Sequence, residues 1–196
     1  MTKRLVSAAA SAAAIGAAAL SLAPAAMAAP NIGGCSLQGT ATFNNPLMAG
    51  PSASPFTYTF TGTLSNCKSG STSGPNSTPT GGTIFTPDPA SGSGSCVSST
   101  TSGVAVVSWN DGDTTVETYT TSGALAAVAQ QGKVVASYTH TNPDGTTTTY
   151  TTNEPSTPVG DSGLGLLAFQ PPSPTSCQTG VNSAAITGTV GQGNDA

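Results

Sequence analysis

The clearest pattern of apolar and polar positions lies in residues 56–64, where Phe56, Tyr58, Phe60 and Leu64 alternate with threonine and glycine. A repeat of two places these side chains on one face of an extended strand. Three aromatic rings on one face indicate either the core face of a small antiparallel sheet or a stacking platform for a ligand. Both interpretations predict a β-strand in this segment.

Residues 103–123 predict a β-hairpin whose turn is formed by Asp111 and Gly112. Both residue types tolerate the positive φ angles that a two-residue type I′ turn requires. This turn sets a register in which Val107 faces Val116. The hairpin supplies two further strands of the predicted sheet.

Short apolar or threonine-rich segments separated by turn residues continue along the chain. Further strands are predicted at residues 39–43, 82–85, 124–130, 133–139, 146–152, 164–169 and 181–190, with turns at Asn45-Pro46, Gln131-Gly132 and Asn142-Pro143-Asp144-Gly145. No segment shows a sustained helical repeat. The chain is therefore expected to be all-β, an antiparallel up-and-down β-barrel or β-sandwich of about nine or ten short strands.

The first residues have the three parts of a secretory signal peptide. Lys3 and Arg4 form a basic region, an alanine-rich apolar run follows, and Ala26-Met27-Ala28 matches a cleavage site. We expect residues 1–28 to be a signal peptide and residues 29–196 to form a single β domain, secreted to the outside of the cell or to its surface. No later segment is long and apolar enough to predict membrane insertion after the signal is removed.

The four cysteines are expected to form two disulfides, because an even number in an exported chain favours bridges and no C-x-x-C spacing suggests a metal site. If the strands run alternately up and down, Cys35 and Cys67 lie at one end of the sheet, and Cys96 and Cys177 lie at the other. Cys35–Cys67 and Cys96–Cys177 is therefore the preferred pairing among the three that four cysteines allow.

Charged residues make up only 6% of the chain, and Lys68 and Lys133 are the two basic residues after the signal. Phosphate groups are bound mainly by lysine and arginine, so nucleic acid is excluded as a partner. The abundance of threonine, valine and spaced aromatic residues argues against disorder despite the low charge.

One four-residue motif suggests catalysis. Residues 160–163 read Gly-Asp-Ser-Gly and resemble the nucleophile region of chymotrypsin-like serine proteases, with His140 as the only histidine available to act as a base. In that family the histidine lies far upstream in its own barrel, whereas His140 shortly precedes Ser162. We therefore expect no catalytic residues.

The acidic residues could also supply a general acid and base. The candidates are Asp111, Asp113, Glu117, Asp144, Glu154 and Asp161. Most of them lie in or beside predicted turns, and we expect all six on the solvated surface. The spacing of residues 110–113 does not fit the helix-flanked calcium loop, so no metal site and no cofactor are predicted.

Four segments together carry a family resemblance. They are residues 60–67 (FTGTLSNC), 92–96 (GSGSC), 108–112 (SWNDG) and 167–172 (LAFQPP). With these segments the chain resembles a family of uncharacterised exported proteins of high-GC Gram-positive bacteria, over most of its mature length. The resemblance implies a β-fold and secretion, and it brings no activity, substrate or catalytic residue.

We expect an exported, non-catalytic monomer that binds a small apolar molecule or a glycan at or outside the cell surface. The ligand-binding candidates are Phe56, Tyr58, Phe60, Trp109 and Tyr119. Two alternatives stay open. One is an extracellular hydrolase that uses Ser162 or a pair of carboxylates, and the other is a structural or adhesive surface protein.

Overall fold

The computed structural model describes residues 33–50, 54–68, 79–124, 126–173 and 175–193, and the predicted signal peptide lies outside these ranges. This part of the chain is nearly all β-strand. Its elements are β1 (Gly33–Leu47), β2 (Ser54–Lys68), β3 (Gly82–Phe85), β4 (Ala90–Gly94), β5 (Ser98–Trp109), β6 (Thr114–Ala124), β7 (Ala127–Val135), β8 (Ser137–Thr141), β9 (Thr147–Thr151), β10 (Ser162–Gln170), α1 (Ser176–Thr179) and β11 (Val181–Gly193).

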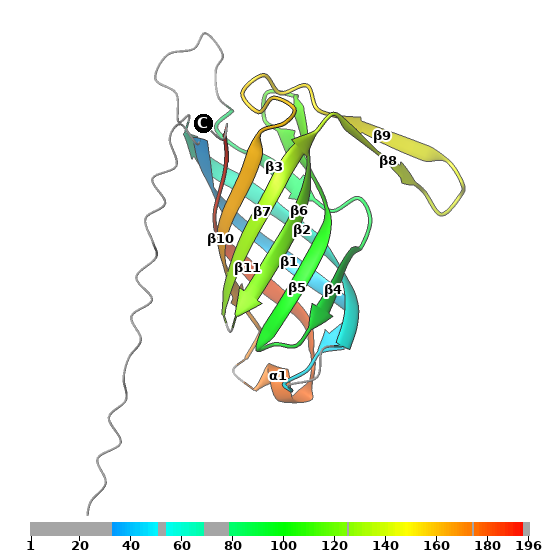
Figure 1. Cartoon of the computed structure of the whole chain (residues 1–196), viewed down its shortest axis with the longest axis vertical. Helices are drawn as coiled ribbons and strands as arrows, with labels where there is room; N and C mark the ends of the chain where they lie inside the picture. The colour runs from blue at the N-terminus through cyan, green and yellow to red at the C-terminus, as the bar shows by residue number, and fades with distance from the viewer. Residues whose placement is uncertain (1–32, 51–53, 69–78, 125, 174, 194–196) are drawn as a thin grey trace, which may run out of the picture.

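The main sheet closes into a barrel, because β1 pairs with β2 on one side and with β11 on the other. The strand order continues through β10, β7, β6 and β5, and the short strands β3 and β4 both bridge β5 to β2. All the pairs are antiparallel, and the chain passes around the wall almost in sequence order (Figure 1). Of the two predicted architectures, the up-and-down barrel is confirmed.

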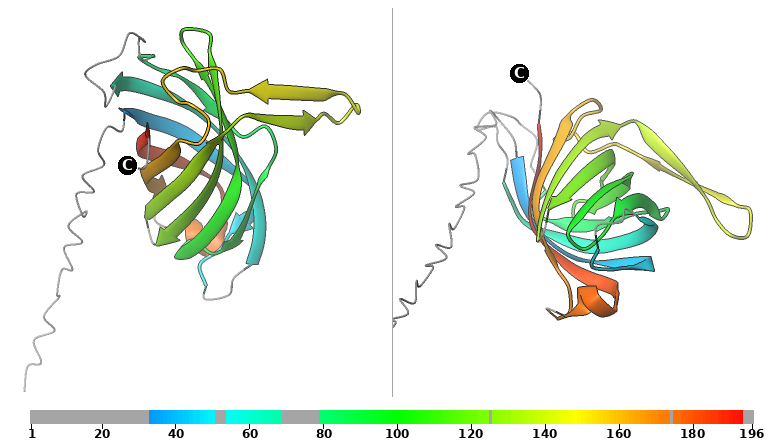
Figure 2. Two further views of the ribbon diagram at one scale, coloured as in Figure 1. Left: turned by 45° about the horizontal axis from the view of Figure 1, so that its top comes forward. Right: turned by 60° about the horizontal axis from the view of Figure 1, so that its bottom comes forward.

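The hairpin of β8 and β9 stands outside this wall. It forms a separate two-stranded sheet, and it extends away from the barrel between β7 and β10 (Figure 2). The described part of the chain therefore consists of a closed barrel and one projecting hairpin.

The aromatic alternation predicted at residues 56–64 is confirmed as a core face. Phe56, Tyr58 and Leu64 of β2 are buried, and the threonines between them are more exposed. The Phe43 ring of β1 lies 5.8 Å from the Phe56 ring in an edge-to-face arrangement, and it contacts Phe169 at 6.2 Å. These rings form the apolar core of the barrel interior.

Glycines on β1, β2 and β4 make room for these rings. A Cβ atom at Gly39 or Gly62 would press on the Phe60 ring, and one at Gly92 would overlap the Phe56 ring. Each ring therefore covers a glycine, an arrangement that fills a narrow barrel without pushing its strands apart.

The hairpin turn between β5 and β6 differs from the predicted one. Gly112 has a φ of 99°, whereas Asp111 is not among the described residues with positive φ. The Gly112 amide donates to the Trp109 carbonyl at 3.2 Å, as in a three-residue loop with glycine in the left-handed region. The longer loop shifts the register by one residue, so Val106 and not Val107 faces Val116.

The turn predicted at Gln131-Gly132 is also wrong. β7 runs through both residues without interruption, and Gly132 faces Tyr119 of β6. A second difference concerns β4, which occupies a glycine- and serine-rich segment where no strand was predicted. In both segments cross-strand pairing outweighs the local preference of glycine for turns.

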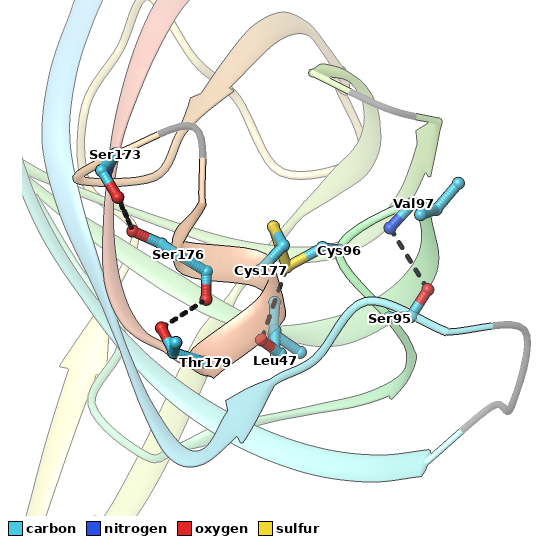
Figure 3. Close-up of a disulfide and its surroundings, with 8 residues drawn as sticks. All are labelled: Leu47, Ser95, Cys96, Val97, Ser173, Ser176, Cys177 and Thr179. Atoms are coloured by element: carbon cyan, nitrogen blue, oxygen red, sulfur yellow. Dashed lines mark hydrogen bonds between the residues drawn. A yellow bond between two sulfur atoms is a disulfide. The ribbon is translucent and has the colours of Figure 1, made fainter.

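Both disulfides form with the predicted pairing. Cys35–Cys67 joins the neighbouring strands β1 and β2. Cys96–Cys177 ties the β4–β5 turn to α1 at the opposite end of the barrel (Figure 3). On the chain-entropy account each bridge stabilises the fold by about 3–5 kcal/mol.

Candidate functional site

The five predicted ligand-binding residues all belong to the barrel interior. Phe56, Tyr58 and Tyr119 are buried in the core cluster, and Phe60 and Trp109 are partly buried against it. The structure thus brings together the residues that the sequence singled out. It gives them packing roles, since the rings contact one another or lie over glycines.

A chain of hydroxyl groups crosses the interior beside the rings. The Tyr58 hydroxyl lies 2.9 Å from that of Tyr119 and 3.0 Å from that of Thr101, which in turn lies 2.7 Å from the hydroxyl of Thr121. Burial raises the pKa of both tyrosines above its ordinary value. Their hydroxyls therefore stay protonated, and they act as hydrogen-bonding groups of the core.

Glu117 brings a carboxyl group into the same interior, where it is only 6% exposed. The side-chain amides of Gln192 and Gln130 donate to it at 2.8 Å and 3.4 Å. Gly132 and Gly163 face each other across β7 and β10, and a Cβ at either would overlap this carboxyl group. Burial raises the pKa of Glu117 above its ordinary value, and the amide donors oppose that shift. The expectation that Glu117 lies on the solvated surface is wrong.

The inward direction of Thr101 and Thr121 fixes which neighbouring side chains point outward. Side chains alternate along a strand, so Thr100 and Ser102 of β5 and the flanking residues of β6 lie on the outer face of the barrel. There they meet outward residues of β4 and β7 around a hollow of about 590 Å³. Its lining consists of Ser91, Gly92, Ser93, Thr100, Thr101, Ser102, Thr120, Thr121, Ser122, Ala129 and Gln131. We call this hollow the outer groove.

The outer groove is uncharged and rich in hydroxyl groups. Cross-strand pairs place Thr100 opposite Ser122 and Ser102 opposite Thr120, and Thr120 faces Gln131 on the other side. Each hydroxyl both donates and accepts a hydrogen bond, and the glutamine amide adds two donors and an acceptor. The groove can therefore bind a neutral ligand that carries many hydroxyl groups.

Sequence reasoning missed this groove. The signal was present as runs of serine and threonine at residues 98–102 and 120–122, on the two arms of one predicted hairpin. The hollow forms only where the four consecutive strands β4 to β7 lie side by side, and the residue pattern of a single strand does not show this.

The other carboxylates and the protease-like motif are placed as follows. Glu154 and Asp161 are buried, so the surface expectation is wrong for them too. Ser162 begins β10 within the barrel wall, where it faces Lys133 of β7. His140 lies on the projecting hairpin, where its Nδ1 atom is 2.8 Å from Asp88.

No family model, curated protein or solved structure matches this chain. Within the described ranges, no helix is long and apolar enough to cross a membrane. The functional interpretation therefore rests on the residues themselves.

Proposed function

We propose that the protein is an exported, non-catalytic barrel that binds a neutral glycan in the outer groove. The lining of this groove carries the proposal: eight of its eleven residues are serine or threonine, and none is charged. Sugars present closely spaced hydroxyl groups, which pair with hydroxyl and amide groups of this kind. The two disulfides are those of a protein that functions in an oxidising compartment.

The barrel interior is less suited to the other predicted ligand, a small apolar molecule. Phe56 and Tyr58 pack against Phe43 of β1, and Phe60 lies over Gly39, so an apolar molecule inside the barrel would have to displace these contacts. A glycan in the outer groove requires no such rearrangement. The groove also lies on the outer face of the wall, where a long polymer can run across the strands.

The proposal is tested by titrating the disulfide-bonded protein with neutral glucan, mannan, galactan and arabinan fragments in a calorimeter. The double variant Thr100→Val and Thr120→Val removes two groove hydroxyls and keeps the β-branched shape that strands favour. We expect at least one fragment to bind wild type, and the double variant to bind it at least tenfold more weakly, roughly the loss of one or two hydrogen bonds.

Thr189→Val is the matched control, because Thr189 is an exposed threonine of β11 that does not line the groove. The affinity of the Thr189→Val variant for the bound fragment should stay within about twofold of that of wild type. Equal weakening by the control and the groove variant would contradict the proposal, as would the absence of binding to every neutral fragment. An apolar molecule that co-purifies with the protein would instead favour the barrel interior.

A further inference from the structure

Three carboxylates that are far apart in sequence meet at one end of the barrel. Asp111 and Asp113 belong to the β5–β6 turn, and Glu154 lies in the segment that follows β9. One carboxylate oxygen from each residue lies within 4.8 Å of the corresponding oxygen of both others. No ion pair joins any of the three to a basic side chain within the described ranges.

The two segments are held together by backbone and amide contacts. The Asn153 side-chain amide donates to the Asp113 carboxylate at 2.9 Å, and its oxygen accepts from the Thr114 backbone amide at 2.7 Å. The backbone amides of Asn153 and Glu154 also donate to the Thr114 carbonyl. These bonds explain how the segments approach each other, but they leave the three negative charges close together.

Glu154 supplies an independent indication that a ligand is missing from this cluster. Its side chain is 2% exposed, and its Oε1 atom accepts from the Ser156 backbone amide at 2.7 Å. Its Oε2 atom is buried and has no hydrogen-bond partner among the described residues. A buried carboxylate oxygen without a partner is costly, and native structures normally provide it with a donor or a cation.

The chemistry of the cluster selects a hard divalent cation. Its donors are carboxylate oxygens, without the histidine or cysteine that zinc and copper sites favour. Ca²⁺ binds oxygen at about 2.3–2.6 Å, so oxygens on opposite sides of one Ca²⁺ lie about 4.6–5.2 Å apart. Mg²⁺ binds at about 2.0–2.1 Å and requires oxygens within about 4.2 Å. The three carboxylate oxygens lie within 4.8 Å of one another, which is inside the span of one Ca²⁺ shell. Ca²⁺ also tolerates irregular geometry, whereas Mg²⁺ requires a near-ideal octahedron.

We propose that Asp111, Asp113 and Glu154 bind one Ca²⁺ ion, which joins the β5–β6 turn to the segment after β9. Water completes the shell of six to eight oxygens that Ca²⁺ takes. This site is independent of the outer groove. Extracellular modules bind Ca²⁺ with a Kd of about 0.1–1 mM, and we expect an affinity in this range.

The chain contains a built-in reporter for this site. Trp109 is the only tryptophan, and it lies two residues before Asp111. Its indole donates to the Thr115 hydroxyl at 2.8 Å, and that hydroxyl contacts the hydroxyl of Thr157, three residues after Glu154. A lanthanide such as Tb³⁺ that replaces Ca²⁺ here would be excited through Trp109.

The test uses the disulfide-bonded mature protein after treatment with a chelator. Tb³⁺ is added and its luminescence is followed with excitation of the tryptophan, and Ca²⁺ and Mg²⁺ are then titrated as competitors. Calorimetry with CaCl₂ alone measures the same affinity directly. We expect saturable sensitised emission, displacement by Ca²⁺ with a stoichiometry near one, and at least tenfold weaker competition by Mg²⁺.

Glu154→Gln and Asp111→Asn each remove one charge and keep an oxygen in the same place, and each should weaken Ca²⁺ binding at least tenfold. Asp111 is exposed, so its variant remains informative if the buried Glu154 variant does not fold. Asp144→Asn is the matched control, because Asp144 also precedes a turn glycine, and its affinity should be unchanged. Absence of saturable binding at 10 mM CaCl₂ would overturn the proposal. Equal effects of Asp111→Asn and Asp144→Asn, or equal affinity for Mg²⁺, would also overturn it.

Discussion

The barrel and its projecting hairpin each contain an Asp-Gly turn, and the two turns are locally almost the same. In the β5–β6 turn the Asp111 carboxylate accepts from the backbone amide two residues later at 3.2 Å, and in the β8–β9 turn Asp144 does so at 2.9 Å. Gly112 and Gly145 both have positive φ, at 99° and 84°. Local sequence therefore determines the shape of both turns.

The surroundings of the two turns differ completely. The β5–β6 turn is packed against the segment that follows β9, which brings Glu154 next to Asp111 and Asp113. The β8–β9 turn is at the tip of a separate two-stranded sheet that extends from the barrel (Figure 1). The same dipeptide can thus take part in a cation site at one position and form only a solvated turn at the other. Tertiary contacts decide which of these two roles the dipeptide has.

The largest expected difference between the two regions is in the pH dependence of stability. Burial raises the pKa of Glu117, in the barrel, above its ordinary 4.5. In the pH window between the ordinary and the raised value, the folded barrel binds more protons than the unfolded chain, so the free energy of unfolding falls as pH rises. The stabilisation that protonated Glu117 provides is complete below the ordinary pKa, and it is lost as pH rises through the raised pKa.

Glu117→Gln keeps the shape of the side chain and removes the titration. We expect it to increase the free energy of unfolding at pH 7 by about 2 kcal/mol, the order of a buried ion's desolvation, and to have little effect at pH 4. Urea unfolding followed by the fluorescence of Trp109 measures both values. The same gain at pH 4 and pH 7 would contradict a titrating Glu117.

The second comparison exchanges the turn glycines for alanine. A Cβ at Gly112 or Gly145 has no atom within 4 Å, so the cost of either change is backbone strain alone, about 1–2 kcal/mol. Gly112→Ala should lower the free energy of unfolding of the barrel by that amount. Gly145→Ala should lower it by at most half as much, because an isolated two-stranded hairpin opens before the barrel unfolds.

Urea unfolding and amide hydrogen exchange together distinguish these outcomes. In Gly145→Ala, exchange should accelerate at the amides of Tyr138 and Tyr150 while the amides of β5 and β6 stay protected. Equal losses of global stability in the two variants would show that the hairpin and the barrel unfold as one unit.

The sequence predicted the antiparallel β fold well where a pattern depends on neighbours along the chain, and it left the choice between barrel and sandwich open. The alternation of Phe56 and Tyr58 predicts an inward face whatever the register, and the meander order predicts both disulfides. It failed at the β5–β6 register, because the choice between a two-residue and a three-residue loop moves each pair by one position. It also failed at Gly132, which makes room for the Glu117 side chain of the neighbouring strand.

The candidate sites were harder to predict, because each depends on how several strands or segments pack together in the closed barrel. Glu154 follows the whole β8–β9 hairpin, so nothing near Asp111 in the sequence indicates a third carboxylate. Glu117 sits between Val116 and Thr118 on a strand, and its burial is visible only when the barrel is closed. The outer groove needs four strands side by side. Local patterns predict which residues form strands, and closure decides what the strands enclose.

The smallest expected effect concerns the contact that docks the hairpin on the β3–β4 loop. The hydroxyl of Tyr138 donates to Asp88, and the His140 ring lies 2.8 Å from the same carboxylate. These contacts, the Tyr138 hydrogen bond foremost, hold the pKa of Asp88 below its ordinary 3.8. The docking energy from Asp88 is therefore present above its ordinary pKa and is lost as pH falls through the lowered value.

Asp88→Asn removes the charge and keeps one acceptor oxygen. The Asp88 side chain is 41% exposed, so solvent and salt screen the contact, and the loss should stay below about 1 kcal/mol. It should appear as faster exchange of the Tyr138 amide at pH 7, while the urea midpoint of the barrel stays unchanged. Unchanged exchange in Asp88→Asn would show that Phe85 and Tyr150, whose rings lie 5.6 Å apart, dock the hairpin without the carboxylate.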